Sequence, residues 1–162
     1  MTRNMAGWMA IAGLAAALTA RAEHFHIELV AAGPDGAKQT SYADEAPPAM
    51  GVNPRPVLKV RAGQPITVQF IMTNVYPHGS IPNAGARYYV VKENAIGQRT
   101  LPALAGNVVT QGSFDLDLKP KARIGARMRI AIAQPGIYLL RVESMRTQNT
   151  HEHFSAIDLQ VQ

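Results

Sequence analysis

From residue 24 onwards, apolar and polar residues alternate along the chain, and this pattern limits the fold more than any other feature. In the first such segment Phe25, Ile27 and Leu29 alternate with polar residues, as in a strand with one buried face. The pattern recurs, in whole or in part, at residues 57–60, 66–72, 87–92, 114–118, 128–132, 137–143 and 157–161. No window after residue 22 keeps a helical period over three turns. We therefore expect an all-β fold of about eight strands, arranged as an antiparallel two-sheet sandwich.

Glycine and proline mark the connections between these segments. Residues 33–56 are rich in Gly, Pro, Ala and Asp, so we expect a long irregular connection there. The sequence Ala62-Gly63-Gln64-Pro65 predicts a turn that joins the strands on either side into a hairpin-like pair.

The first 22 residues have the character of a secretory leader. Arg3 precedes an apolar run from Met5 to Leu18, and Ala20-Arg21-Ala22 provides small residues at the cleavage positions. An uncleaved anchor is the alternative, but the run is shorter than the about 20 residues of a spanning helix. We expect a signal peptide over residues 1–22, a single β-sandwich domain over 23–162, no transmembrane segment after cleavage, and a periplasmic or secreted location.

The charge and the cysteine content limit the partners and metal ligands that this chain can have. Without Arg3 and Arg21 the chain has 14 basic and 11 acidic residues, a net charge of +3. The basic stretch from Lys119 to Arg129 lacks interleaved aromatic residues, so we expect a solvated face and no nucleic-acid partner. There is no cysteine, which excludes disulfides and thiolate metal ligands.

Histidine is distributed unevenly. Four of the five histidines form two His-x-His pairs, His24-Phe25-His26 and His151-Glu152-His153, whereas chance would give roughly 0.14 such pairs. Residues i and i+2 of a strand share a face, so two imidazoles can reach one zinc or copper ion. His78 follows Pro77 in a predicted loop. The alternative is that each pair is a polar surface feature with a structural role.

Other chemistries have little support in the sequence. The serines lack a nucleophile-elbow context, and no glycine-rich phosphate loop follows a strand. Asp115 and Asp117 fit a solvated strand face, and Met72 and Met128 fit a core better than a copper site. We therefore do not expect an enzyme.

The second half of the chain resembles the cupredoxins, the copper-binding sandwiches of the periplasm and plastid. The resemblance covers roughly residues 57–162 and rests on the order Ala62-Gly63, a strand, Asn74 and Pro77-His78. It continues with Pro135-Gly136-Ile137-Tyr138 and a histidine-bearing loop before the last strand. The segment from His151 to Leu159 also resembles the ending of small exported bacterial proteins.

The chain departs from the cupredoxin pattern at the metal ligands. Val142 stands where the family has its cysteine, and no methionine follows His153, so a blue-copper centre is excluded. The resemblance implies a cupredoxin-like fold and an all-histidine site. It places His78, His151 and His153 at one end of the sandwich and the start of the first strand at the other.

Two main functional hypotheses follow. The first is an exported metal-binding protein, for copper or zinc, with His78, His151 and His153 as ligands. Cleavage after Ala22 would also let His24 and the new α-amino group chelate copper, with His26 nearby, as a separate site. The second is an immunoglobulin-like binding or assembly module that engages an envelope protein without a metal. A hydrolase that uses a metal-bound water is a weaker third possibility.

Overall fold

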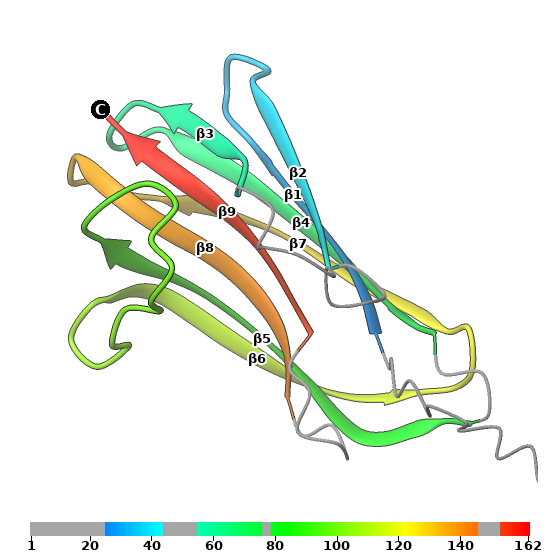
Figure 1. Ribbon diagram of the computed structural model, residues 1–162. Helices are drawn as coiled ribbons and strands as arrows, with labels where there is room; N and C mark the ends of the chain where they lie inside the picture. The colour runs from blue at the N-terminus through cyan, green and yellow to red at the C-terminus, as the bar shows by residue number, and fades with distance from the viewer. Residues whose placement is uncertain (1–24, 44–54, 76–78, 146–152) are drawn as a thin grey trace, which may run out of the picture.

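The computed structural model describes residues 25–43, 55–75, 79–145 and 153–162. These residues form nine strands, which lie in two layers (Figure 1). The strands are β1 (Phe25–Ala32), β2 (Lys38–Ala43), β3 (Val57–Val60), β4 (Pro65–Asn74), β5 (Ile81–Glu93), β6 (Val108–Leu118), β7 (Arg123–Ala131), β8 (Gly136–Met145) and β9 (Phe154–Val161). The all-β sandwich expected from the alternating pattern is confirmed, with one strand more than the expected eight or so.

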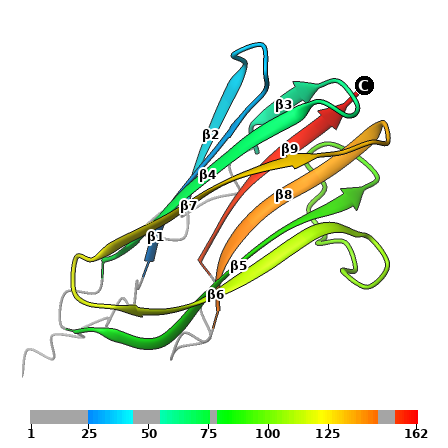
Figure 2. The ribbon, with the colours of Figure 1, turned by 180° about the vertical axis from the view of Figure 1, so that it is seen from behind.

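The strands divide into a four-stranded sheet, in the order β2-β1-β4-β7, and a five-stranded sheet, in the order β3-β9-β8-β5-β6. All pairings are antiparallel except that of β3 with β9, which is parallel. Figure 2 shows the two layers from behind. Within the described residues, no helix is long and apolar enough to cross a membrane.

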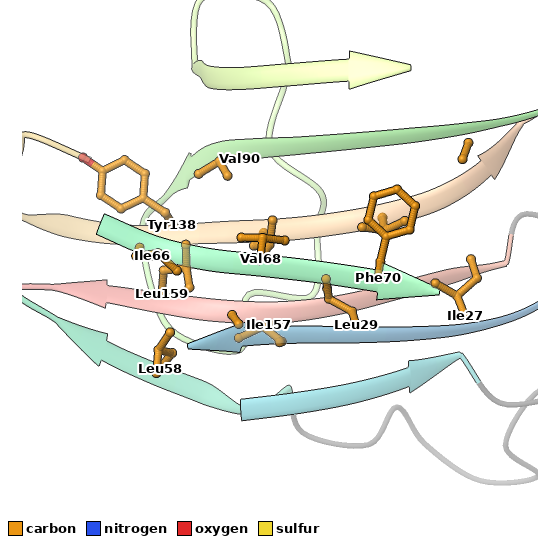
Figure 3. Packing of buried hydrophobic residues seen from close by; sticks show 14 of the residues in the cluster. Ile27, Leu29, Leu58, Ile66, Val68, Phe70, Val90, Tyr138, Ile157 and Leu159 are labelled. Atoms are coloured by element: carbon orange, nitrogen blue, oxygen red, sulfur yellow. The ribbon is translucent and has the colours of Figure 1, made fainter. Parts of the chain in front are cut away.

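The core lies between the inner faces of the two sheets (Figure 3). In β1 the inward residues Phe25, Ile27 and Leu29 are fully buried, and the residues between them are half-buried. Ile27 lies opposite Met72 of β4, and Leu29 lies opposite Phe70. The alternation therefore places one apolar row of each strand against the facing sheet, as the sequence predicts.

The outer face of the five-stranded sheet is also covered. Tyr89, Val91, Leu139 and Ala156 form a second apolar cluster there, against which Leu104 packs from the connection between β5 and β6. This burial on both faces explains why seven of the ten residues of β8 are buried. It also explains why β8 lacks the clean alternation of β1.

Two expectations about connections were wrong. The strands on either side of Ala62–Pro65 do not form a hairpin, because β3 belongs to the five-stranded sheet and β4 to the other. Gly63, at a φ of 74°, sits in a turn closed by a hydrogen bond from the Gln64 N–H to the Arg61 carbonyl, at 3.2 Å, as in a type II turn. The turn leads the chain from one sheet to the other.

The predicted irregular connection over residues 33–56 contains a strand, β2. It pairs with β1 from Ala32–Lys38 to Ile27–Ala43. The tight turn at Gly36, which has a φ of 86°, allows the chain to reverse after Ala32. The sequence of β2, KQTSYA, carries almost no apolar residues, because the strand lies at the sheet edge and buries only Ala43.

Candidate functional site

One end of the sandwich gathers segments that are far apart in the sequence. β1 begins there at Phe25, which lies opposite Asn74, the last residue of β4. The buried side-chain amide of Asn74 donates hydrogen bonds to the carbonyls of Gly79, Leu118 and Lys119 at 3.2, 3.0 and 3.1 Å. Asn74 thereby ties the chain after β4 to the end of β6. We call this region the histidine end.

His153 also lies at the histidine end. Its ring meets the ring of Phe25 edge-on, with 6.5 Å between the ring centroids. Its backbone N–H donates to the Ser144 hydroxyl at 3.0 Å, and its carbonyl accepts from the Ser144 N–H at 2.8 Å. The start of β9 is therefore fixed against both the end of β8 and the start of β1.

This arrangement corrects one expectation. The cupredoxin likeness placed the start of the first strand at the end away from His153, but Phe25 and His153 are in contact. The reason is that β1 runs antiparallel to β4, so its first residue lies beside the last residue of β4. Figure 1 shows the start of β1, the end of β4 and the start of β9 on the side away from the C-terminus.

His26 lies apart from His153. Its ring stacks on Tyr42 of β2, with 5.9 Å between centroids and 26° between planes. Since neighbouring residues of a strand point to opposite faces, His26 lies on the outer face of the four-stranded sheet, whereas Phe25 points inward. The Nδ1 atom of His26 is buried and has no hydrogen-bond partner among the described residues.

The other three predicted ligands, His24, His78 and His151, lie outside the described residues, as does the predicted leader. Among the residues that are described, no three His, Asp or Glu side chains are placed to hold a metal ion. Val142, at the position where the cupredoxin resemblance would place a cysteine, is fully buried in the core.

The sequence reasoning missed a cluster of charges on the outer face of the five-stranded sheet. Arg55 bridges two carboxylates: its Nη2 lies 2.9 Å from Glu93 Oε2 and its Nε lies 2.7 Å from Asp158 Oδ1. Both carboxylate side chains are fully buried. Asp158 also accepts the Gly97 N–H at 2.6 Å. Burial raises the pKa of Glu93, as does the negative charge of Asp158, while Arg55 opposes the rise.

A second buried cluster centres on Glu143 of β8. Arg87 donates to Glu143 Oε1 from both Nε and Nη2, and Arg141 Nε lies 2.7 Å from Oε2. The Tyr89 hydroxyl donates to Oε2 at 3.3 Å. Burial raises the pKa of Tyr89 well above its ordinary value. The guanidinium of Arg141 also lies over the ring of Phe154, 4.0 Å from its centroid.

Each of these carboxylates is paired with an arginine, although Asp158 Oδ1 makes no hydrogen bond among the described residues. A signal for them exists in the sequence. Arg141 and Glu143 stand at i and i+2 inside a mostly apolar strand, and charges at such positions require partners when both faces of the strand are buried.

No protein-family model and no curated protein matches this chain. Among solved structures, a CARDB domain from Pyrococcus furiosus in complex with di-metal ions is 12% identical, with a TM-score of 0.46 over 86% of this chain and 94% of that one. The soluble domain of PmoD from Methylocystis is 11% identical, with a TM-score of 0.40 over 84% and 90%.

A family 123 glycoside hydrolase from Clostridium perfringens is 12% identical, with a TM-score of 0.45. The alignment covers 67% of this chain but spans only 23% of the hydrolase. At such identities a similarity concerns the fold alone, and the chain is similar to these proteins only as a β-sandwich.

Proposed function

We propose that this protein is an exported metal-binding protein that holds copper, or alternatively zinc, at the histidine end through His78, His151 and His153. One observation carries the proposal. The described residues nearest to these histidines are linked by contacts: Phe25 touches His153 and lies opposite Asn74, whose amide binds the Gly79 carbonyl.

Covalent geometry connects these described residues to the predicted ligands. His78 directly precedes Gly79, His24 directly precedes Phe25, and His151 is two residues from His153. Consecutive Cα atoms are about 3.8 Å apart. The series of contacts that leads from Gly79 through Asn74 and Phe25 to His153 thus supports a single site and extends it to His24, which the sequence alone assigned to a separate one.

The proposed ligands are imidazole nitrogens, which suit metal ions such as copper and zinc. Imidazole nitrogen is a common ligand of copper and zinc, and the chain has no cysteine that would favour a thiolate site. An α-amino group next to His24, created by cleavage after Ala22, would add a nitrogen donor that favours copper. Amino-terminal sequencing of the secreted protein tests that cleavage.

Isothermal titration of the exported, purified protein with Cu(II) and Zn(II) tests the proposal. We expect one ion to bind with a Kd tighter than about 10 μM. Replacing His78, His151 and His153 by Gln should weaken binding at least about 100-fold, with the thermal midpoint measured to confirm folding. Gln preserves much of the bulk that His153 packs against Phe25.

His26→Gln is the matched control, because the His26 ring stacks on Tyr42 on the outer face of the sheet. We expect its affinity to stay within about threefold of the unchanged protein. Absence of binding tighter than about 10 μM in the unchanged protein would refute the proposal. Loss of binding in His26→Gln, with binding retained in the triple variant, would place the metal elsewhere.

A further inference from the structure

The two sheets each leave a long edge strand on the same side of the sandwich. β6 pairs only with β5, and β7 pairs only with β4, among the residues that the structure describes. The two strands follow one another in the chain, joined by the turn over residues 119–122 at the histidine end (Figure 2). They therefore run in opposite directions, each with one row of backbone groups open to a further strand.

Apolar side chains are exposed along both edges. Phe114 of β6 is 39% exposed although its ring contacts Phe70 and Tyr88, and Ile124 of β7 is 40% exposed. These residues belong to the inward rows of their strands. The inward rows of the two edge strands are thus partly open to solvent on this side.

The outward rows of the two strands carry opposite charges. β6 exposes Asp115 and Asp117, whereas β7 exposes Arg123, Arg127 and Arg129. Gly125 stands between Arg123 and Arg127 and, with Ile71 of β4, lines a surface hollow of about 650 Å³. The exposed charges of β6 therefore complement those of β7.

We propose that two copies of this chain form a symmetric dimer in which β6 of each copy pairs with β7 of the other. A two-fold axis parallel to the strands keeps strand directions, so β6 meets β7 of the partner subunit antiparallel. The same axis places the outer face of the four-stranded sheet of one copy beside the outer face of the five-stranded sheet of the other. Two continuous nine-stranded sheets result, each joining the four-stranded sheet of one copy to the five-stranded sheet of the other, and no edge on this side remains open.

The register between β6 and β7 of the partner subunit follows from which residues of β6 and β7 lie at the same height along the strands within one chain. Phe114 packs on Phe70, whose partner in β7 is Ala126, and Asn74 binds both the Leu118 and the Ala122 carbonyls. Because the two-fold axis is parallel to the strands, it leaves each residue at the same height along the strands. Asp117 then lies opposite Arg123 of the partner subunit, and Asp115 lies opposite Gly125 of the partner subunit, diagonal to the arginines beside that glycine.

Charge reversal tests this pairing. We expect the exported protein to sediment as a dimer within a range of about 1 to 500 μM. Asp117→Arg and Arg123→Asp should each weaken association by about tenfold or more, and the two changes combined should restore it to within about threefold. Lys38→Asp on β2, at the opposite edge, is the control and should leave association unchanged.

Disulfide trapping tests the register, since the chain has no cysteine of its own. An oxidised mixture of Asp117→Cys and Arg123→Cys chains should form an intermolecular disulfide, because these positions face each other across the interface. Neither variant alone should do so. A monomer throughout the concentration range would overturn the proposal, as would a dimer that neither responds to charge reversal nor yields the mixed disulfide.

Discussion

The two sheets bury their surfaces in different ways. In the four-stranded sheet, β7 alternates between exposed and half-buried residues from Gly125 onwards, and its outer row consists of three arginines, a glycine and an alanine. In the five-stranded sheet, β8 is buried on both faces and contains Arg141 and Glu143. The first sheet follows the simple rule of apolar inside and polar outside. The second must neutralise charges within a covered face, so its stability depends on specific partners.

The largest expected effect tests that dependence. Arg55→Met removes the cation that Glu93 and Asp158 share, which leaves two buried carboxylates without a compensating charge. We expect the free energy of unfolding, measured by denaturant titration at pH 7, to fall by about 3 to 5 kcal/mol. Lys59→Met, on the exposed side of β3, should change it by less than about 0.5 kcal/mol. Equal losses in the two variants would show that the Arg55 bridge is not formed in solution.

Leucine truncation compares the two faces of β8. Leu139 belongs to the outer cluster and Leu140 to the central core, and both are buried. If the outer face is covered as the structure shows, Leu139→Ala and Leu140→Ala should each cost about 2 to 5 kcal/mol. Ile124→Ala on the open edge strand should cost less than about 1 kcal/mol in the monomer. Thermal unfolding at low protein concentration gives all three values, and a cost for Leu139→Ala as small as that for Ile124→Ala would contradict the covered outer face.

A smaller loss of stability is expected when Tyr89 is changed. Tyr89→Phe removes the hydroxyl that donates to Glu143, while Arg87 and Arg141 still bind that carboxylate. We expect a loss of about 1 kcal/mol. Because burial raises the pKa of Tyr89, ultraviolet titration of the folded protein should show a phenol that ionises only above the ordinary pKa of tyrosine and that is missing in Tyr89→Phe. If Tyr89→Phe removes an ordinary phenol from the titration curve, the hydroxyl is not buried as described.

The difference between the sheets also explains what the sequence could predict. β1, β4 and β7 were recognised because only one of their faces is buried. β2 was not, because at its sheet edge only Ala43 is fully buried. The hairpin expected around Gly63 was wrong because alternation does not tell which sheet a strand joins. Only the register places Phe25 opposite Asn74 and so brings the first strand to the histidine end. The charges of Arg141 and Glu143 in β8 show locally that partners are needed, but the bridge from Arg55 to Glu93 and Asp158 joins residues that are distant in the sequence, so no local pattern reveals it.

The smallest expected effect is a pH dependence of the stability, which arises from a buried charge of the five-stranded sheet. The pKa of Glu93 is raised in the folded protein, first by burial and then by Asp158, with Arg55 opposing. A carboxyl group whose folded pKa is raised favours the folded state when protonated. Its contribution is therefore present below the unfolded pKa of about 4.5 and is lost as the pH rises through the folded pKa.

Glu93→Gln removes this titration and keeps the side-chain size. The stability of the unchanged protein relative to Glu93→Gln should therefore decline as the pH rises from about 4.5. Chemical denaturation of both proteins across that window measures the difference, and Glu28→Gln, on the outer face of the four-stranded sheet, is the control. A difference that grows in favour of the unchanged protein with rising pH would mean that Arg55 outweighs burial. The Arg55 bridge would then stabilise the sheet through its charges as well as by joining β5 to β9.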